Sequence, residues 1–247
     1  MFKILIFLLF STIMIAGEIR VAVAANVSYA IKDLTKAFHK IYPDIKVQVI
    51  LGSSGKLTAQ IKHGAPYGLF LSADMRYPEV LYKEGLAVSK PRVYAQGTLA
   101  YLSSKEQDFS EGIKLLCSPK IHKIAVANPK TAPYGIATAQ ALKKTGIYKD
   151  IVKKFVYGES ISQTLSFTLQ AADIGFVASS ALFSPKMAQY KKGINWDDVE
   201  SKLYTPINQG IVILKYGQNS KDIEAFYHFM LSDKAKEILH AYGYMIP

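Results

Sequence analysis

The chain has 247 residues, of which half are hydrophobic and a fifth are charged, so it is long enough for one large or two small globular domains. Its formal net charge is +11, but basic residues occur only as doublets such as Lys143-Lys144, which argues against a nucleic-acid-binding arm. The single cysteine, Cys117, excludes an internal disulfide, and we expect its thiol to be buried and unreactive. The five histidines are scattered, and none has metal-ligand spacing to another.

The N-terminal segment 1–17 is expected to be a cleaved secretory signal. It has one lysine followed by an apolar run that ends in the small residues Ala16 and Gly17. The run is shorter than the ~20 apolar residues that a membrane-spanning helix needs. No cysteine lies near the expected cleavage site, so we expect an exported, soluble protein without a lipid anchor.

The first third of the mature chain consists of strand, turn and helix units. Apolar alternation predicts strands over 19–24, 45–51 and 69–72, and helical spacing predicts helices over 31–41, 57–63 and 78–84. In the second unit, Gly52-Ser53-Ser54-Gly55 joins strand to helix, and we expect Ser54 at or near the helix N-cap. This order is typical of a parallel sheet with crossover helices.

The second part repeats the pattern between two long extended stretches, 93–103 and 204–214. Between them we expect strands over 123–127, 154–157 and 174–178, a loop over 128–135, and helices over 136–144 and 161–171; two more helices follow, over 223–231 and 234–242. Two crossings around a complete α/β block predict two lobes that close around a ligand. Lobe I would comprise residues 18–97 and 206–247, and lobe II residues 98–205.

Two catalytic interpretations of the serine-rich turn fit poorly. The nucleophile elbow requires G-x-S-x-G, and the stretch from Gly52 to Lys56 does not match it. A phosphate loop requires Ser or Thr after its lysine, whereas Leu57 follows Lys56. A secreted serine hydrolase stays open as an alternative, as does an ordinary capped turn without a ligand.

Neutral hydrogen-bond donors recur at the turns that follow the predicted strands: Asn26 and Ser28, Ser53 and Ser54, Tyr134, and Ser160. The carboxyl ends of strands are where open α/β sheets bind ligands, and helix N-termini there favour anions. Hydroxyl, amide and backbone N–H donors suit a small, fully ionised oxyanion, since each oxygen that loses water must regain a hydrogen bond. A site without acceptors would disfavour a protonated anion such as hydrogen phosphate.

These segments resemble the periplasmic molybdate-binding proteins of ABC importers over essentially the whole mature chain. The resemblance rests on five motifs in order: Ala24-Ala25-Asn26-Val27-Ser28, Gly52-Ser53-Ser54-Gly55, the run from Gly64-Ala65-Pro66 to Leu69-Phe70-Leu71-Ser72-Ala73-Asp74, Asn128-Pro129 with Ala132-Pro133-Tyr134-Gly135, and Gly175-Phe176-Val177. It implies an α/β, two-lobed type II periplasmic binding fold with two crossing hinge segments. The implied ligand is molybdate or tungstate, held by hydrogen bonds alone.

Carried over residue by residue, the resemblance assigns the anion to Asn26, Ser54, Tyr134 and Ile161, with the backbone N–H of Ala25 as a further donor. Tyr134 and Ile161 would donate through their backbone N–H groups. Many family members carry serine where this chain has Asn26, whose amide NH₂ can still donate. Two second choices are Ser28 and Ser53. Many members also carry a tyrosine donor where this chain has Ala178, and the sequence does not say what replaces it.

The sequence therefore predicts a monomeric periplasmic receptor that captures molybdate or tungstate and delivers it to the permease of an ABC importer. We expect it to catalyse nothing, and to bind no cofactor, no metal cation and no nucleic acid. A receptor for sulfate or another tetrahedral oxyanion is the main alternative. A receptor for an organic ligand is less favoured, because no arginine stands at these turns to pair with a carboxylate.

Overall fold

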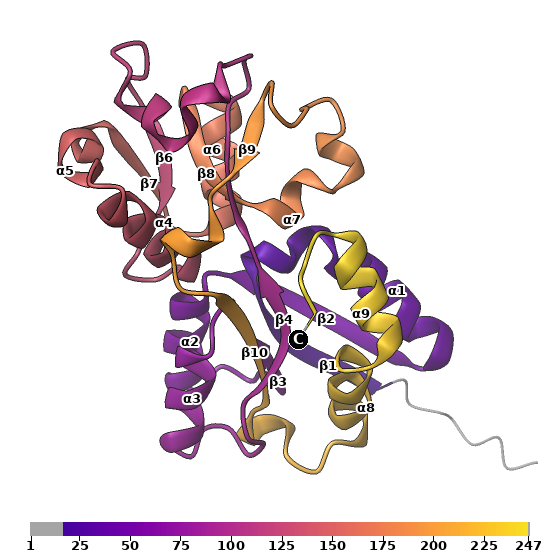
Figure 1. Ribbon diagram of the computed structural model, residues 1–247. Coiled ribbons are helices and arrows are strands. Elements are labelled where there is room, and N and C mark those ends of the chain that lie inside the picture. The colour runs from indigo at the N-terminus through magenta and orange to yellow at the C-terminus, as the bar shows by residue number, and fades with distance from the viewer. Residues whose placement is uncertain (1–16, 247) are drawn as a thin grey trace, which may run out of the picture.

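The computed structural model describes residues 17–246, and nearly all of the expected signal segment lies outside them. Two α/β lobes lie one above the other, and extended segments cross between them (Figure 1). Each lobe is built on one five-stranded sheet. Among the described residues, no helix is both long enough and apolar enough to cross a membrane.

The sheet of the first lobe is mixed, with parallel pairing on one side and antiparallel pairing on the other. Its strands are β1 (Gly17–Ala24), β2 (Ile45–Gly52), β3 (Leu69–Leu71), β4 (Arg92–Gly97) and β10 (Ile207–Ile213), in the order β2-β1-β3-β10-β4. β1 pairs in parallel with β2 and β3, and β10 pairs antiparallel with β3 and β4. The carboxyl ends of β1, β2 and β3 therefore meet at one edge of the sheet.

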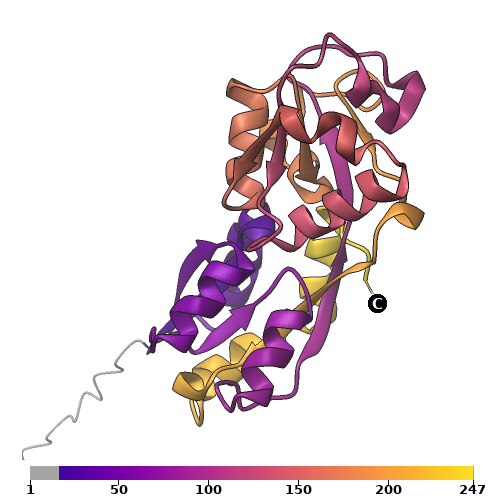
Figure 2. The same cartoon turned by 90° about the vertical axis from the view of Figure 1, so that its left-hand side faces the viewer.

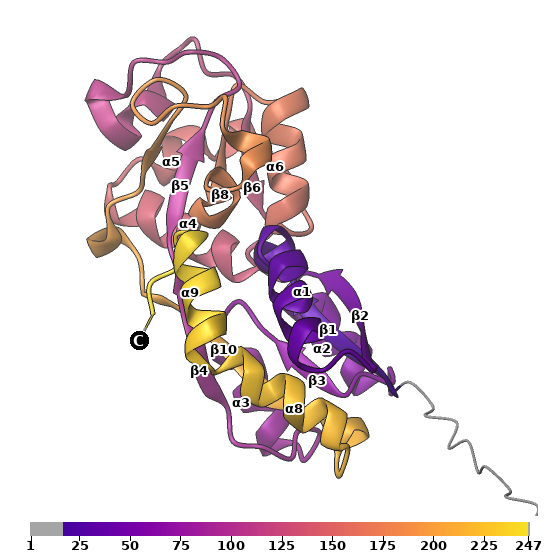
Figure 3. The same cartoon turned by 90° about the vertical axis from the view of Figure 1, so that its right-hand side faces the viewer.

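Helices cover both faces of this sheet (Figures 1 and 3). They are α1 (Ile31–Ile41), α2 (Ser54–Lys62), α3 (Arg76–Lys83), α8 (Lys221–Met230) and α9 (Asp233–Ala241). The apolar stripe of α1 packs on α8, where the rings of Phe38 and Phe226 meet edge-on with centroids 4.9 Å apart. On the opposite face, Leu57 of α2 packs with Ala22 of β1. The alternation of β1 thus supplies both cores, each buried side chain contributing roughly 1.5–3 kcal/mol if it is large.

The second lobe has the same design. Its strands are β5 (Leu99–Leu102), β6 (Ile124–Ala127), β7 (Phe155–Gly158), β8 (Ile174–Ala178) and β9 (Trp196–Asp198), in the order β7-β6-β8-β5-β9. Its helices are α4 (Pro133–Lys144), α5 (Tyr148–Ile151), α6 (Ile161–Gln170) and α7 (Ser179–Leu182). β6 is parallel to β7 and β8, so α4 and α6 both begin at the edge that faces the first lobe (Figure 2).

The chain passes between the lobes twice, first from β4 to β5 and later from β9 to β10. The C-terminal residues return to the first crossing, because Met245 pairs with Gln96 of β4. The first sheet draws its strands from residues 17–97 and 207–213, and the second from 99–198. The lobe boundaries that we expect, 18–97 with 206–247 and 98–205, stay a prediction.

Two sequence expectations are wrong in detail. Cys117 is exposed, not buried, at the end of a 3₁₀ helix (Phe109–Cys117) whose inward residues are apolar. The expected loop 128–135 is too long, because α4 already begins at Pro133. Proline is well suited to the first position of a helix, where its missing N–H costs nothing.

Candidate functional site

The segments that follow five strands meet between the lobes. They line a small cavity of about 10 Å³, with contributions from Ala24, Ala25, Asn26, Ser53, Ser54, Ala73, Ala132, Pro133, Tyr134 and Ile161. Lobe I supplies the ends of β1, β2 and β3, and lobe II supplies the N-termini of α4 and α6. A cavity of this volume is about the size that one water molecule requires. The five first-choice residues of the sequence analysis are thus neighbours, although they lie between positions 25 and 161 of the chain.

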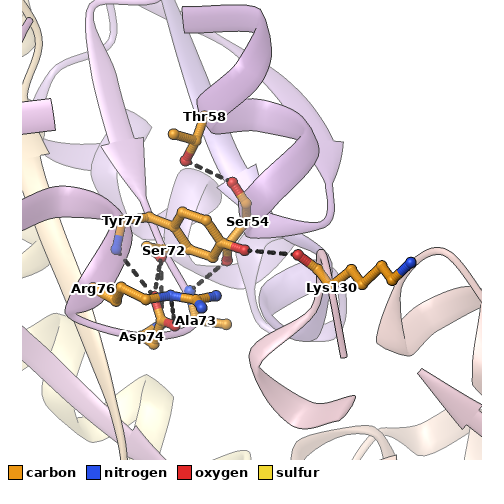
Figure 4. A network of polar contacts seen from close by, with 8 residues as sticks. All are labelled: Ser54, Thr58, Ser72, Ala73, Asp74, Arg76, Tyr77 and Lys130. Atoms are coloured by element: carbon orange, nitrogen blue, oxygen red, sulfur yellow. Dashed lines mark hydrogen bonds and ion pairs between the residues drawn. The ribbon is translucent and has the colours of Figure 1, made fainter. Parts of the chain in front are cut away.

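Ser54 is the first residue of α2, and its hydroxyl is set up to donate. The backbone N–H of Ala73 donates to Ser54 Oγ at 2.9 Å, and this leaves the hydroxyl hydrogen free for a ligand (Figure 4). The N-cap itself is Ser53, whose Oγ accepts from the N–H of Lys56 at 3.4 Å. Ser53 therefore caps the helix while Ser54, one position later, faces the cavity from the first turn.

Tyr134 and Ile161 present backbone N–H groups from the first turns of α4 and α6. Such groups have no partner within their own helix. Within residues 17–246, neither these two N–H groups nor that of Ser54 donates a hydrogen bond. The positive ends of three helix dipoles converge on the cavity, which favours an anion there.

Asn26 lies in a 3₁₀ helix (Ala25–Tyr29) and is 1% exposed. Its side chain differs from the sequence expectation, because the amide does not offer its hydrogens to the cavity. Asn26 Nδ2 donates to Gln209 Oε1 at 2.9 Å and to the Tyr244 hydroxyl at 3.0 Å. These partners lie in a crossing strand and near the C-terminus, more than 180 residues away in the sequence. A local sequence pattern therefore cannot predict them. Asn26 can still offer its backbone N–H.

The two second-choice serines have different positions. Ser53 lines the cavity, whereas Ser28 does not. Ser28 Oγ lies 3.3 Å from Ser162 Oγ, and Ser162 donates to the carbonyl of Ala25 at 2.8 Å. Ser28 therefore contributes to the contact between the lobes. Ala178, the last residue of β8, is absent from the lining and carries no donor in its side chain.

All ten lining residues are uncharged, and the ion pairs stand outside them. Lys56 and Glu159 pair at 3.4 Å between the lobes, with side chains that are 56% and 72% exposed. Asp74 lies directly after Ala73, where it accepts from the N–H of Tyr77 and pairs with Arg76 at 3.6 Å (Figure 4). Burial raises the pKa of Asp74, and the hydrogen bond from Tyr77 and the charge of Arg76 partly oppose this rise.

Sequence reasoning missed Ala73 as a member of the site. Its position could have indicated it, because Ala73 follows the apolar strand Leu69–Leu71 by two positions, as Ser54 follows β2. Its residue type could not, because alanine contributes only its backbone and has no polar side chain to point to a site.

The lobes touch around the cavity. The N–H of Gly55 donates to the carbonyl of Thr131 at 2.9 Å, and the Tyr77 hydroxyl donates to the Lys130 carbonyl at 3.5 Å (Figure 4). On the opposite side, Ser180 Oγ donates to the carbonyl of Asn26 at 3.1 Å. The structure is therefore that of a closed cleft.

Other chemistries find little support in the described part of the chain. There, no histidine or carboxylate is hydrogen-bonded to the hydroxyl of Ser53 or Ser54. Across residues 17–246, no three His, Cys, Asp or Glu side chains are grouped so that they could hold a metal ion. What the cavity offers is a set of neutral donors at a water-excluding closure between two lobes.

Comparisons with known proteins agree with this geometry. A family model described as bacterial extracellular solute-binding protein matches residues 19–245. The molybdate-binding protein ModA of Azotobacter vinelandii is 38% identical over 231 residues, which cover 93% of this chain and 90% of that protein. ModA of Rhodobacter capsulatus is 35% identical over 232 residues, 93% of this chain and 89% of that protein. The solved periplasmic molybdate-binding protein of Azotobacter vinelandii superposes with a TM-score of 0.86 at 33% identity, covering 93% of this chain and 99% of that one. These matches extend over both lobes and both crossings, and the two-lobed fold predicted from the sequence is confirmed.

Proposed function

This chain belongs to the family of bacterial extracellular solute-binding proteins, and we propose from that premise that it captures molybdate or tungstate in the periplasm and delivers it to the permease of an ABC importer. The resemblance to periplasmic molybdate-binding proteins is confirmed by relatives at 35–38% identity over most of the chain. The two named relatives bind molybdate according to their names, and the proposal extends this to the present chain.

The observation that carries the proposal is the composition of the cavity wall. Every lining residue is neutral, and three helix N-termini point their free N–H groups inward. A doubly charged oxyanion without a proton can accept hydrogen bonds at all its oxygens, so such a wall replaces its lost hydration. We assign the binding to Asn26, Ser54, Tyr134 and Ile161, with the N–H of Ala25 beside them. Ser53 and Ser28 act as the helix cap and the lobe contact described above.

We infer that the protein is a monomer, holds no cofactor or metal cation, and catalyses no reaction. The lobes, 18–97 with 206–247 and 98–205, would open and close about the two crossings, and the closed form would be recognised by the importer. A ligand drives such closure only as far as it binds the closed form better than the open one.

Calorimetric titration of the protein with molybdate, tungstate, sulfate and phosphate tests the proposal. We expect tight one-to-one binding of molybdate and tungstate, weak binding of sulfate, and none of phosphate. Tight sulfate binding would keep the receptor and change its ligand. No heat with any of the four would refute the oxyanion assignment, and turnover of an ester probe that is lost in Ser54→Ala would point to a hydrolase instead.

A further inference from the structure

Asn26 has one side-chain atom without a partner. Both hydrogens of its amide nitrogen are used, by Gln209 and by Tyr244. Its Oδ1 is buried and makes no hydrogen bond within the described chain. An unpaired buried acceptor is costly, so it calls for an explanation in terms of function. Asn26 lines the anion cavity, and no protein group in the described chain reaches its Oδ1.

Gln209 holds the amide of Asn26 in this orientation. It is fully buried on the crossing strand β10, next to an irregularity in the pairing with β4. Its Oε1 accepts from the Tyr94 hydroxyl at 2.7 Å and from Asn26 Nδ2 at 2.9 Å. Its Nε2 lies 3.5 Å from the Tyr134 hydroxyl. Since Oε1 faces Asn26, the nitrogen of Asn26 must face Oε1, and its oxygen must point elsewhere.

We propose that Gln209 is a positioning residue that decides whether Asn26 offers an acceptor or a donor to the bound anion; this inference rests on the proposed function. In the orientation described, Asn26 offers the acceptor Oδ1, which repels an anion oxygen that carries no proton. Molybdate has no proton to donate, so a hydrogen bond between the Asn26 side chain and molybdate requires the opposite orientation. The two amides must therefore turn together when molybdate binds, because oxygen facing oxygen would be repulsive.

The surroundings allow this paired rotation. After it, Gln209 Nε2 donates to Asn26 Oδ1, and Gln209 Oε1 accepts from the Tyr134 hydroxyl. Asn26 Nδ2 then occupies the place of the unpartnered Oδ1 and donates to the anion. The Tyr244 hydroxyl, which donates to the carbonyl of Asn26 at 2.9 Å, turns its one hydrogen to Asn26 Oδ1 instead, and the carbonyl keeps Ser180 as its donor at 3.1 Å. The rotation costs the Tyr94 hydroxyl its acceptor, and only a ligand that needs a donor at Asn26 offsets that cost.

Two substitutions of Gln209 distinguish a residue that orients the Asn26 amide from one that only stabilises the site. In Gln209→Glu, an ionised carboxylate can only accept, so it locks Asn26 in the acceptor orientation. We expect molybdate affinity to fall at least about tenfold. Lowering the pH should restore the affinity, because a protonated carboxyl can again donate to Asn26 Oδ1. The affinity of the unsubstituted protein should not change over the same pH range. The titratable groups that face position 209 are Tyr94, Tyr134 and Tyr244, and burial raises the pKa of each, so none titrates in this range.

In Gln209→Met, no group constrains the amide, and Asn26 can turn toward the anion alone. Molybdate affinity should then stay within about threefold of the unsubstituted value. A residue that merely supports the site would lose affinity in both variants. Loss in both, or no change in both, would overturn the proposal. Thermal unfolding of each variant shows that it is folded.

Gln96→Glu is the matched control for charge. Gln96 lies on the other crossing strand, where its amide donates to Asn208 at 2.7 Å, in an exposed position. The Gln96→Glu variant should bind molybdate nearly as tightly as the unsubstituted protein, and its affinity should not show the pH dependence expected of Gln209→Glu. If Gln96→Glu behaves like Gln209→Glu, added charge explains both, and the inference fails. If the unsubstituted protein binds no molybdate at all, the proposed function fails instead.

Discussion

Ser54 donates from a fixed position, because the N–H of Ala73 holds its oxygen at 2.9 Å. Replacing Ser54 by alanine removes one donor to the anion and leaves the N–H of Ala73 without its acceptor. We expect the affinity for molybdate to fall by about 1–3 kcal/mol, the cost of one unpaired polar group at a buried site. Calorimetric titration measures this loss.

Ser53→Ala is the control at the neighbouring position. Ser53 caps α2, so its loss should lower the free energy of unfolding by about 0.5–2 kcal/mol and change anion affinity less than Ser54→Ala does. The reverse pattern, with Ser53 governing affinity and Ser54 governing stability, would contradict the assignment.

A second residue-scale prediction concerns the buried tyrosines. Burial raises the pKa of Tyr244 from the ordinary tyrosine value of 10.0 to about 12. In the unfolded chain the phenol ionises first, so its contribution to stability is complete below pH 10 and is lost as the pH rises toward 12. Two pKa units correspond to roughly 2–3 kcal/mol.

Urea unfolding at pH 9 and pH 11 measures the effect. The free energy of unfolding should fall between these values, and it should fall less in Tyr244→Phe, which lacks the ionising group. An equal fall in both proteins would assign the loss to other tyrosines. Tyr94 and Tyr134 are also buried, and their pKa values are raised in the same direction, so some of the fall should remain.

Individual site residues could be predicted where they follow a strand directly. Ser54 stands just after a strand that its apolar residues mark, Ile161 was assigned through the family resemblance, and both line the cavity. The amide of Asn26 could not be placed, because its partner Gln209 is 183 positions away. Ala73 was missed because it acts through its backbone. Cys117 was expected to be buried because its neighbours in sequence are apolar, yet it lies exposed at the end of a 3₁₀ helix.

At the scale of elements, the N-terminus of α2 also carries the contact between the lobes. Ser54 faces the cavity, and the next N–H, that of Gly55, donates to the Thr131 carbonyl of lobe II. A Cβ at position 55 would lie 2.9 Å from both Cα and O of Thr131, and 2.7 Å from the Tyr77 hydroxyl. Those Thr131 atoms are backbone, so they cannot turn aside. Any side chain at position 55 therefore holds the lobes apart.

Gly55→Ala should weaken molybdate binding at least about tenfold while leaving the free energy of unfolding of the ligand-free protein unchanged or raised, since alanine is the better helix former. Small-angle scattering should show less compaction on adding molybdate. Lys56→Ala is the matched control, because it removes an exposed interlobe ion pair that is worth little. Full compaction and normal affinity in Gly55→Ala would show that the lobes close without this contact.

Elements with a strong apolar pattern were predictable, including the three-residue β3, whereas the polar strand β9 was not. The strands β1, β2, β6 and β8 follow from apolar alternation or apolar runs. β9 has only three residues, Trp196–Asp198, and two of them are aspartates that no strand pattern favours. It exists because β5 offers a free edge, which is a tertiary cause. The early start of α4 was missed because Pro133 also suits a loop.

At the scale of the whole molecule, repeated strand–helix units and two long crossings were enough to predict two lobes. The closed arrangement was not predictable, because its contacts join residues such as Gly55 and Thr131 across the chain. The closed arrangement also depends on small residues where the lobes touch, such as Gly55. The net charge of +11 adds a diffuse attraction for anions, which speeds encounter without choosing among them.

The proposed mechanism requires that one anion binds both lobes at once. Amide hydrogen exchange tests this, because the N–H of Ser54 belongs to lobe I and those of Tyr134 and Ile161 to lobe II. Molybdate should slow exchange at all three helix N-termini together. It should also stabilise the protein by about 2.7 kcal/mol at a hundredfold excess over the dissociation constant, since it binds only the folded chain.

Hydrogen phosphate at the same concentration is the control for ionic strength and charge, and it should give neither effect. Protection confined to α2 would mean that the anion binds lobe I alone and that closure is independent of it. Protection at all three N-termini that is lost in Gly55→Ala only on the α4 and α6 side would place lobe I first in the binding sequence. In that case the second lobe contributes through closure, and its helix dipoles convert an initial encounter with lobe I into retention of the anion.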